Sequence, residues 1–198
     1  MYCGIISLRS LAINIFILHT DPIKAAQLQC DKHVVKMIVE SAQMLSTVHR
    51  MVDGKMERRP SKSGSMLQYW VHPDAHMERT LYKACHYNHP STVWTRESIQ
   101  NYIWHYDHFY ALCHEYTYRY GKIHSTQTKL EDVLSIPPTN IPHIGPTPFK
   151  LAMAAFPQCI VEDPVQSYRN FYQTKQERFK MVWTDRPVPE WFNELRSA

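Results

Sequence analysis

The chain has 198 residues, of which 44% are hydrophobic and 20% charged, and its formal net charge is +4 with histidine neutral. These values are typical of an ordinary globular chain, while a 12% aromatic content beside only 5 glycines excludes a disordered, collagen-like or glycine-rich linker protein. The mild positive charge suits a polyanionic partner without requiring one. Histidine is frequent, with 12 residues, and the use of these side chains is the main question that the composition raises.

The cysteines and the N-terminal stretch bear on the compartment. The 5 cysteines are widely spaced and form no CxxC pair, which argues against a disulfide framework or a zinc knuckle and fits a reducing cytoplasm. The apolar stretch 1–18 is interrupted by Arg9 and several polar residues, and no small-residue cleavage site follows. We therefore expect a cytoplasmic protein, in the host cytoplasm if its source is viral, with no membrane contact and no obligate protein partner.

The hydrophobic periodicity predicts a single, mainly α-helical domain over residues 1–198, with little or no sheet. In the first half of the chain we expect a possible upstream extension at 1–12, a short strand or buried extended segment at 13–18, a helix from about 22 to 50 with a break near 30, and an exposed basic loop at 53–65. A helix at 75–85 and a long aromatic helix at 92–119 should follow. The remaining expected elements are a proline-rich irregular segment at 123–150 packed on the helices, a helix at 164–181 and an extended aromatic tail at 183–192. Thr20 or Asp21 is a candidate cap for the first helix, Ser91 caps the aromatic helix, and Gly121 ends it.

A polar stripe runs along the first long helix. It consists of His33, Lys36, Glu40, Gln43 and Thr47, at steps of three, four, three and four residues. One interpretation is a solvated face, in which a Lys36–Glu40 pair adds a few tenths of a kcal/mol. The other is the wall of a site, because a base, a cation and a histidine in one patch suit acid–base chemistry beside an anionic substrate.

Other histidines occur in loose pairs. The pairs are His72/His76, His86/His89 and His105/His108. Such spacings bind metals when they lie on helices, but they also arise by chance in a histidine-rich chain. We predict no metal and no cofactor, and keep a metal-dependent hydrolase built on His72/His76 and His86/His89 as an alternative. His105 is predicted to be a core residue, and His89 either lies rigidly near a cleft or caps a helix.

Several familiar catalytic motifs are missing. The sequence contains no GxSxG, GxxxxGK[ST] or GxGxxG pattern, which argues against acyl hydrolases, P-loop enzymes and Rossmann enzymes. It also lacks the HxE…PCxxC pattern of zinc deaminases.

The first long helix resembles that of the pyrimidine dimer DNA glycosylases of the endonuclease V type, through Asp31-x-His33 followed by Glu40 and Gln43. The chain is also similar to a broader group of phage and bacterial proteins related to that family. The further matching features are Asp31-Lys32, the Lys36/Glu40/Gln43 stripe, His89-Pro90 with Trp94, Cys113-x-Glu115, the run Arg119-Tyr120-Gly121-Lys122, and the aromatic run 168–172.

The resemblance implies a helical enzyme that binds double-stranded DNA at damaged or modified pyrimidines. Such an enzyme cuts the glycosidic bond and nicks the strand by imine formation and β-elimination. Glu40 falls at the position of the assisting carboxylate, and His33 would orient a phosphate or Glu40. The expected DNA contacts, besides Lys36, are Lys32, Gln43, His89, Trp94, Arg58 and Arg59.

The nucleophile departs from the family pattern. In the family it is the amine at the chain start, which here corresponds to Ile13 or Asn14, yet twelve residues precede that point. Either residues 1–12 extend the chain beyond the functional start, or the imine chemistry is lost, or Lys36 or Lys32 supplies the amine. A catalytically silent DNA-binding module of the same fold remains a further alternative.

Overall fold

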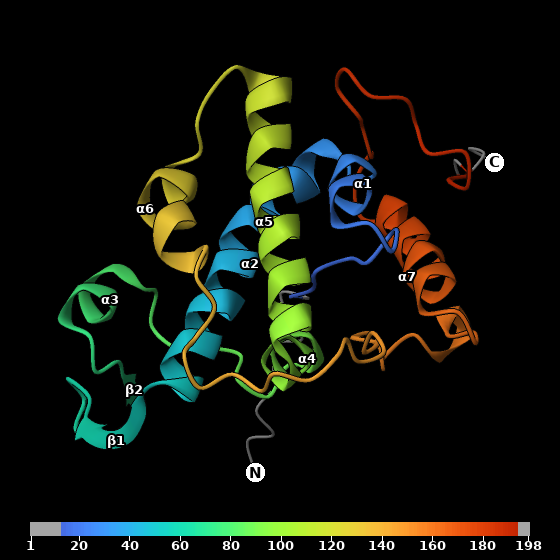
Figure 1. The fold of residues 1–198 in the computed structure, drawn as a ribbon. Coiled ribbons are helices and arrows are strands. Elements are labelled where there is room, and N and C mark those ends of the chain that lie inside the picture. The colour runs from blue at the N-terminus through green and yellow to red at the C-terminus, as the bar shows by residue number, and fades with distance from the viewer. Residues whose placement is uncertain (1–12, 194–198) are drawn as a thin grey trace, which may run out of the picture.

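Two long helices cross at the centre of the computed structural model, which describes residues 13–193 (Figure 1). The α-helices of this range are α1 (Pro22–Gln27), α2 (Asp31–Val52), α3 (Ala75–Thr80), α4 (Pro90–Glu97), α5 (Ile99–Tyr120), α6 (Ser125–Leu134) and α7 (Pro164–Gln173). Short 3-10 helices lie at Pro157–Cys159 and Thr174–Glu177. The central pair is α2 and α5, and the predicted mainly α-helical class is confirmed.

The first helices begin and end close to the predicted points. The Asp21 carboxylate accepts hydrogen bonds from the backbone N–H groups of Ile23 and Lys24, and Pro22 occupies the first turn. The predicted break near residue 30 separates α1 from α2. At the far end of α5, Gly121 adopts the left-handed conformation with φ of 63°, which terminates the helix as expected.

The predicted helix at 92–119 is instead two helices. Ser98 has extended backbone, and its side chain accepts a hydrogen bond from the N–H of Asn101, so it starts α5 as a cap. The proposed Ser91 cap was wrong, since α4 begins at Pro90 and the His89 side chain accepts from the Ser91 N–H. Both differences follow from local hydrogen bonds that override the apolar periodicity.

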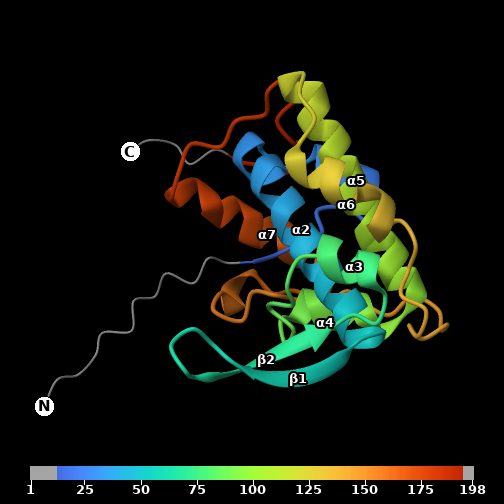
Figure 2. The same cartoon turned by 90° about the vertical axis from the view of Figure 1, so that its left-hand side faces the viewer.

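The predicted exposed loop at 53–65 contains a strand, and the small amount of sheet that was expected is one two-stranded hairpin. Strands β1 (Lys55–Pro60) and β2 (Met66–Val71) pair antiparallel, with Lys55 opposite Val71. The hairpin projects from the helices (Figure 2). Gly54 permits this geometry, because a Cβ atom there would lie 2.3 Å from the Arg50 carbonyl oxygen and 2.6 Å from that of Val71.

The proline-rich segment is partly regular. Helix α6 lies inside the range 123–150 that was predicted to be irregular, while the part after α6 has no regular structure. This later part covers Trp94, whose Nε1–H donates to the Thr147 carbonyl at 3.2 Å. Among residues 13–193, the structure contains no helix with the length and apolar character needed to cross a membrane.

The N-terminal segment 13–18 is a buried extended segment rather than a strand, and all six of its residues are buried. Phe16 has φ of 47°, a left-handed conformation that is strained for a bulky side chain. The Asn14 side-chain oxygen accepts hydrogen bonds from the N–H groups of Ile15 and Phe16 and so holds this turn. These hydrogen bonds therefore fix the backbone conformation of the buried segment 13–18.

Four histidines serve as turn and helix caps, which accounts for a third of the histidine content. In each of them the ring Nδ1 accepts a hydrogen bond from the backbone N–H two residues later, at 2.9–3.2 Å. These residues are His19, His72, His89 and His124. A neutral imidazole thereby takes the role that Asp, Ser or Asn usually fills at such positions.

Candidate functional site

The N-terminal segment lies against the polar stripe of α2. The Asn14 backbone N–H is close enough to the Glu40 carboxylate to favour its charged form, and the His89 ring donates to the Ile13 carbonyl. The Asn14 side chain donates to the Ala152 carbonyl at 3.1 Å. The structure thus brings together Asn14, Glu40 and His89, which are far apart in the sequence.

Glu40 is the most unusual carboxylate of this group. Its Oε1 lies 2.9 Å from the Lys36 ammonium, yet its Oε2 is buried without a hydrogen-bond partner among the described residues. Burial raises the pKa of Glu40 above its ordinary value, and Lys36 and the Asn14 N–H offset part of that effect. Only 8% of the Glu40 side chain is exposed, against 37% for Lys36. The pair is therefore neither a solvated surface bridge nor a closed core contact.

His33 lies deeper than expected. Its ring stacks on Phe16 at a centroid distance of 4.7 Å. The Tyr172 hydroxyl accepts from the Cys30 N–H and shares a hydrogen bond with His33 Nδ1 at 2.8 Å. Burial, together with the charges of two lysines, lowers the pKa of His33 to about 3. A buried neutral ring adds no positive charge to the site, so a role of His33 in orienting a phosphate or Glu40 stays a prediction and would depend on a hydrogen bond rather than on charge.

Lys175 is a residue that the sequence analysis missed. It lies in the 3-10 turn after α7, is only 5% exposed, and places its Nζ 3.4 Å from the Phe171 ring centroid. Burial is the main cause that lowers its pKa to about 8, and the Lys36 charge adds to it. Lys175 also acts on the His33 ring electrostatically. No local pattern distinguishes this lysine from the exposed ones around it, because its burial depends on how the C-terminal segment folds back.

The predicted DNA contacts are dispersed. Trp94 is 2% exposed, so a base cannot stack on it, and its assignment as a DNA contact was wrong. Lys32 is exposed, with its Nζ 4.6 Å from the Phe179 ring centroid, and Gln43 is half-buried. Arg58 and Arg59 are exposed on β1 of the hairpin.

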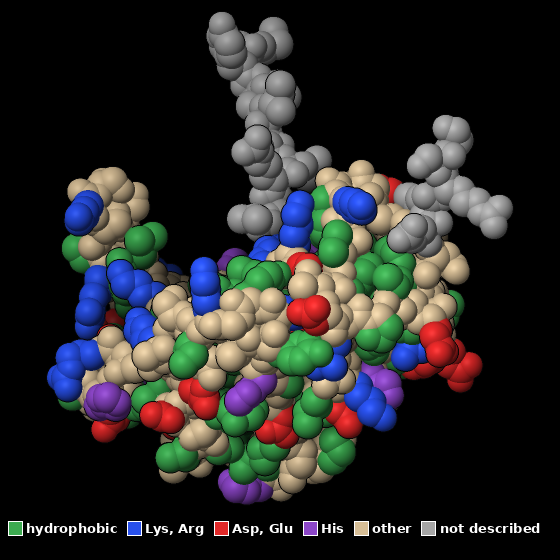
Figure 3. Space-filling view, turned by 90° about the horizontal axis from the view of Figure 1, so that it is seen from above, with side chains coloured by type: hydrophobic (Ala, Val, Ile, Leu, Met, Phe, Trp, Pro, Cys, Tyr) green, Lys and Arg blue, Asp and Glu red, His purple; other side chains and the backbone are tan. Residues whose placement is uncertain are grey.

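A basic pocket of about 670 Å³ lies at the base of the hairpin. Its charged lining residues are Arg50, Arg59, Glu78, Arg79 and Lys83. Lys and Arg side chains also gather on the projecting arm and the adjacent face (Figure 3). Ten residues of helix, about 15 Å, separate Glu40 from Arg50 along α2.

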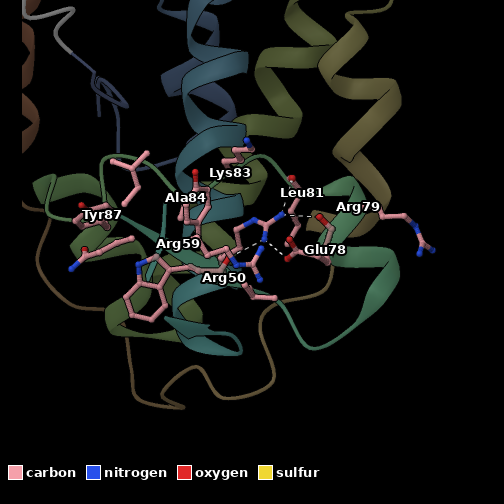
Figure 4. Close-up of a pocket in the computed structure, with 13 residues that line it drawn as sticks. Arg50, Arg59, Glu78, Arg79, Leu81, Lys83, Ala84 and Tyr87 are labelled. Atoms are coloured by element: carbon pink, nitrogen blue, oxygen red, sulfur yellow. Dashed lines mark hydrogen bonds and ion pairs between the residues drawn. The ribbon is translucent and has the colours of Figure 1, made fainter. Parts of the chain in front are cut away.

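Arg50 holds this pocket in shape. Its guanidinium pairs with the Glu78 carboxylate and donates to the carbonyls of Glu78 and Leu81 (Figure 4). It also donates to the carbonyls of Trp70 and Tyr82. Because its side chain is only 4% exposed, Arg50 fixes the hairpin and α3 onto α2 rather than reaching for a ligand. The other cations that line the pocket are Arg79, Lys83 and Arg59, the last of which pairs with Glu57.

The predicted metal pairs do not form a site with each other. Among residues 13–193, the group of three potential ligands with mutually close donor atoms is His49, Asp53 and His72. Neither His76, His86 nor His89 belongs to it. The alternative of a hydrolase built on these predicted pairs is therefore not carried by the geometry.

Comparison of the chain with protein-family models, curated proteins and solved structures gave no significant match.

Proposed function

We propose that the protein is a DNA glycosylase with AP-lyase activity that acts on damaged or modified pyrimidines in double-stranded DNA. The observation that carries the proposal is the Lys36–Glu40 pair at the N-terminal segment. It joins an amine, a carboxylate of raised pKa and an unpartnered carboxylate oxygen within one partly open patch. Perturbed carboxylates with a specific charge partner are typical of acid–base sites.

Lys36 is the amine that the geometry favours for imine formation. The nitrogen of Asn14 is an amide in this chain, because Ile13 precedes it, and an amide is not a nucleophile. Lys32 lies eight residues before Glu40 on α2 with its Nζ over Phe179. The Lys36 Nζ, in contrast, lies 2.9 Å from Glu40 Oε1, where the carboxylate can accept the proton that makes the amine nucleophilic.

The proposed reaction has two steps. The neutral Lys36 amine attacks C1′ of the damaged nucleotide and the C1′–N bond breaks. The base leaves with its electron pair and takes from Glu40 the proton that Glu40 had accepted from Lys36, which restores the carboxylate. The new C1′ amine passes a proton to the ring oxygen as the C1′–O bond opens, which gives an iminium. Glu40 then removes a proton from C2′, and the C3′–O bond breaks to release the strand as a phosphate. Water finally hydrolyses the imine and restores Lys36.

The proposal predicts that borohydride traps the full-length protein on duplex DNA that contains an abasic site or a pyrimidine dimer. Lys36→Arg should abolish the adduct, because arginine retains the charge beside Glu40 but forms no stable imine. Glu40→Gln should lower strand cleavage by about 10²–10⁴-fold, the usual contribution of a positioned general base. Adducts are read on denaturing gels.

Lys32→Arg is the matched control, since it makes the same change one helical turn away and should leave trapping unchanged. Loss of trapping in Lys32→Arg but not in Lys36→Arg would reassign the nucleophile. If the wild-type chain binds DNA but gives no adduct and no nick, the protein is the silent binding module instead.

DNA binding should depend on salt through the basic hairpin. Arg58→Gln combined with Arg59→Gln is expected to weaken binding of undamaged duplex and to reduce the slope of log K against log salt by about 1–2, the number of phosphate contacts removed. Fluorescence anisotropy across a salt series measures this slope. The same two changes made at Arg178 and Lys180 serve as the control, and an equal effect there would show that the hairpin has no special part.

A further inference from the structure

Two buried histidines at the end of α2 have ring nitrogens without partners. His49 is 2% exposed and His72 is 7% exposed. His49 Nδ1 and His72 Nε2 lack any hydrogen-bond partner within the described part of the chain. A buried polar nitrogen without a partner costs free energy, so two of them in one place indicate a missing ligand.

Asp53 completes the group. The donor atoms of His49, Asp53 and His72 all lie within 4.8 Å of one another. The Asp53 carboxylate, at the end of α2, also accepts hydrogen bonds from the N–H groups of Thr139 and Asn140, both at 2.8 Å. The Asn140 side-chain amide also donates to Asp53 Oδ1 at 3.0 Å, so Oδ1 accepts two bonds, while Oδ2 accepts only the Thr139 bond and keeps a lone pair for a ligand.

The hydrogen bonds around His49 leave the lone pair of its Nδ1 available to a ligand. The Tyr102 hydroxyl donates to the Leu134 carbonyl at 2.9 Å, so it accepts the proton of His49 Nε2 at 2.7 Å. This fixes the ring proton on Nε2 and leaves the Nδ1 lone pair directed at the group. Histidine ligands in metal sites are held in this way by a hydrogen bond on the opposite nitrogen.

Binding of a ligand at His72 Nε2 would break the hydrogen bond by which His72 caps the next turn. Its Nδ1 accepts from the Asp74 N–H at 3.2 Å, the longest distance of the four histidine caps together with that of His89. Ligation through Nε2 places the ring proton on Nδ1, so this contact opens. His72 directly follows β2, and Gly54 joins the hairpin to the end of α2, which carries His49 and Asp53.

We propose that His49 Nδ1, the Asp53 carboxylate and His72 Nε2 bind one divalent transition-metal ion of the zinc class. Two imidazoles and one carboxylate are a donor set that Zn²⁺ prefers, with a fourth position left for water or an exogenous ligand. Tetrahedral zinc places its donor atoms about 3.4 Å apart, so the three groups close by about 1 Å on binding. The ion joins α2, the base of the hairpin and the segment after α6, and this inference does not depend on the proposed DNA chemistry.

The test is a titration of the chelator-stripped, full-length protein with Co²⁺, followed by Zn²⁺. One Co²⁺ per chain should bind with the visible absorption of a tetrahedral site, and Zn²⁺ should displace it. His72→Ala and Asp53→Asn should each weaken binding at least about 10-fold. His76→Ala is the matched control, because this histidine is exposed, lies four residues away and is outside the group.

A second measurement guards against variants that fold poorly. Zn²⁺ should raise the Tm of the wild type and of His76→Ala, reversibly with chelator, and should not raise that of His72→Ala or Asp53→Asn. The proposal is overturned if the wild type binds no stoichiometric metal, or if His72→Ala and His76→Ala bind it equally well.

Discussion

Between pH 7 and pH 5 the protein is expected to lose at least about 5–6 kcal/mol of stability, because three buried histidines, besides His49 at the end of α2, are held neutral in its interior. Burial lowers the pKa of His33 and His105 to about 3 and that of His108 to about 4. The unfolded chain, with histidine pKa near 6.5, binds these protons first. The stability is therefore complete above about pH 6.5 and falls as the pH drops toward the folded-state values, by about 1.4 kcal/mol per group and pH unit.

Burial keeps the two histidine rings of α5 neutral, and their hydrogen bonds fix the position of the ring proton. Thr95 donates its hydroxyl proton to the Ser91 carbonyl, so His105 Nδ1 donates to Thr95 at 2.7 Å, and His105 Nε2 is buried without a partner. His108 Nδ1 donates to the Pro22 carbonyl, and its Nε2 can accept from Gln29 at 3.1 Å. An added proton would find no acceptor at His105 Nε2, whereas at His108 the Ile15 carbonyl, 3.0 Å from Nε2, could accept it, so burial is what keeps His108 neutral.

Urea unfolding at pH 7, 6 and 5, followed by circular dichroism, measures this loss. In His108→Gln the loss of unfolding free energy between pH 7 and pH 5 should be smaller by about 2 kcal/mol, which is the contribution of one histidine. This difference is expected whatever the variant's stability at pH 7. His76→Gln changes an exposed ring and should leave the pH dependence intact. An unchanged unfolding free energy from pH 7 to pH 5 would show that these rings are not neutral in the folded state.

Arg119→Met should destabilise the protein by about 3–5 kcal/mol, because it breaks a buried ion network. The Arg119 side chain is fully buried and pairs with Glu115 and Asp31, each at 2.8 Å. Asp31 also holds Thr184, and Glu115 is bound a second time by Arg186. The network thus ties the start of α2, the end of α5 and the C-terminal segment together.

Two controls separate the buried pair from a general effect of removing arginine. Arg186→Met alters the more exposed partner, 27% exposed, and should cost about 1 kcal/mol or less. Adding Glu115→Gln to Arg119→Met should cost less than the sum of the two single changes, since both changes remove the same Arg119–Glu115 ion pair. Thermal and urea unfolding measure the stability of both control variants. If the losses in stability from Arg119→Met and Glu115→Gln simply add in the double variant, the two residues do not act as a network.

The sequence was sufficient where local chemistry decides structure. Asp21 before Pro22, and Gly121 after the aromatic helix, marked element ends that the structure confirms. The hairpin escaped prediction because all of β1 is exposed, which removes the alternation that marks a half-buried strand. Arg50 holds it in place from α2, and no local pattern records that contact.

The candidate site was predicted in part. Helical spacing placed Lys36 next to Glu40, and the two do pair. The same spacing did not distinguish the half-exposed Lys36 from the buried His33, since burial depends on Phe16 and Tyr172 from the two ends of the chain. The resemblance residues Asp31, Glu115 and Arg119 prove to be parts of one structural ion network, so a motif match here reflects stability as well as chemistry.

The two-stranded hairpin leaves one backbone edge of each strand without a neighbouring strand, and such edges invite pairing with another chain. The charges of Glu57, Arg58 and Arg59, followed by Pro60, lie along β1, and charge and proline are the usual means by which proteins keep edges from joining. The same side chains that we assign to DNA therefore also keep the molecules apart. A chain that loses them gains a tendency to aggregate, and the exposed Met56, Met66 and Leu67 would supply the contact.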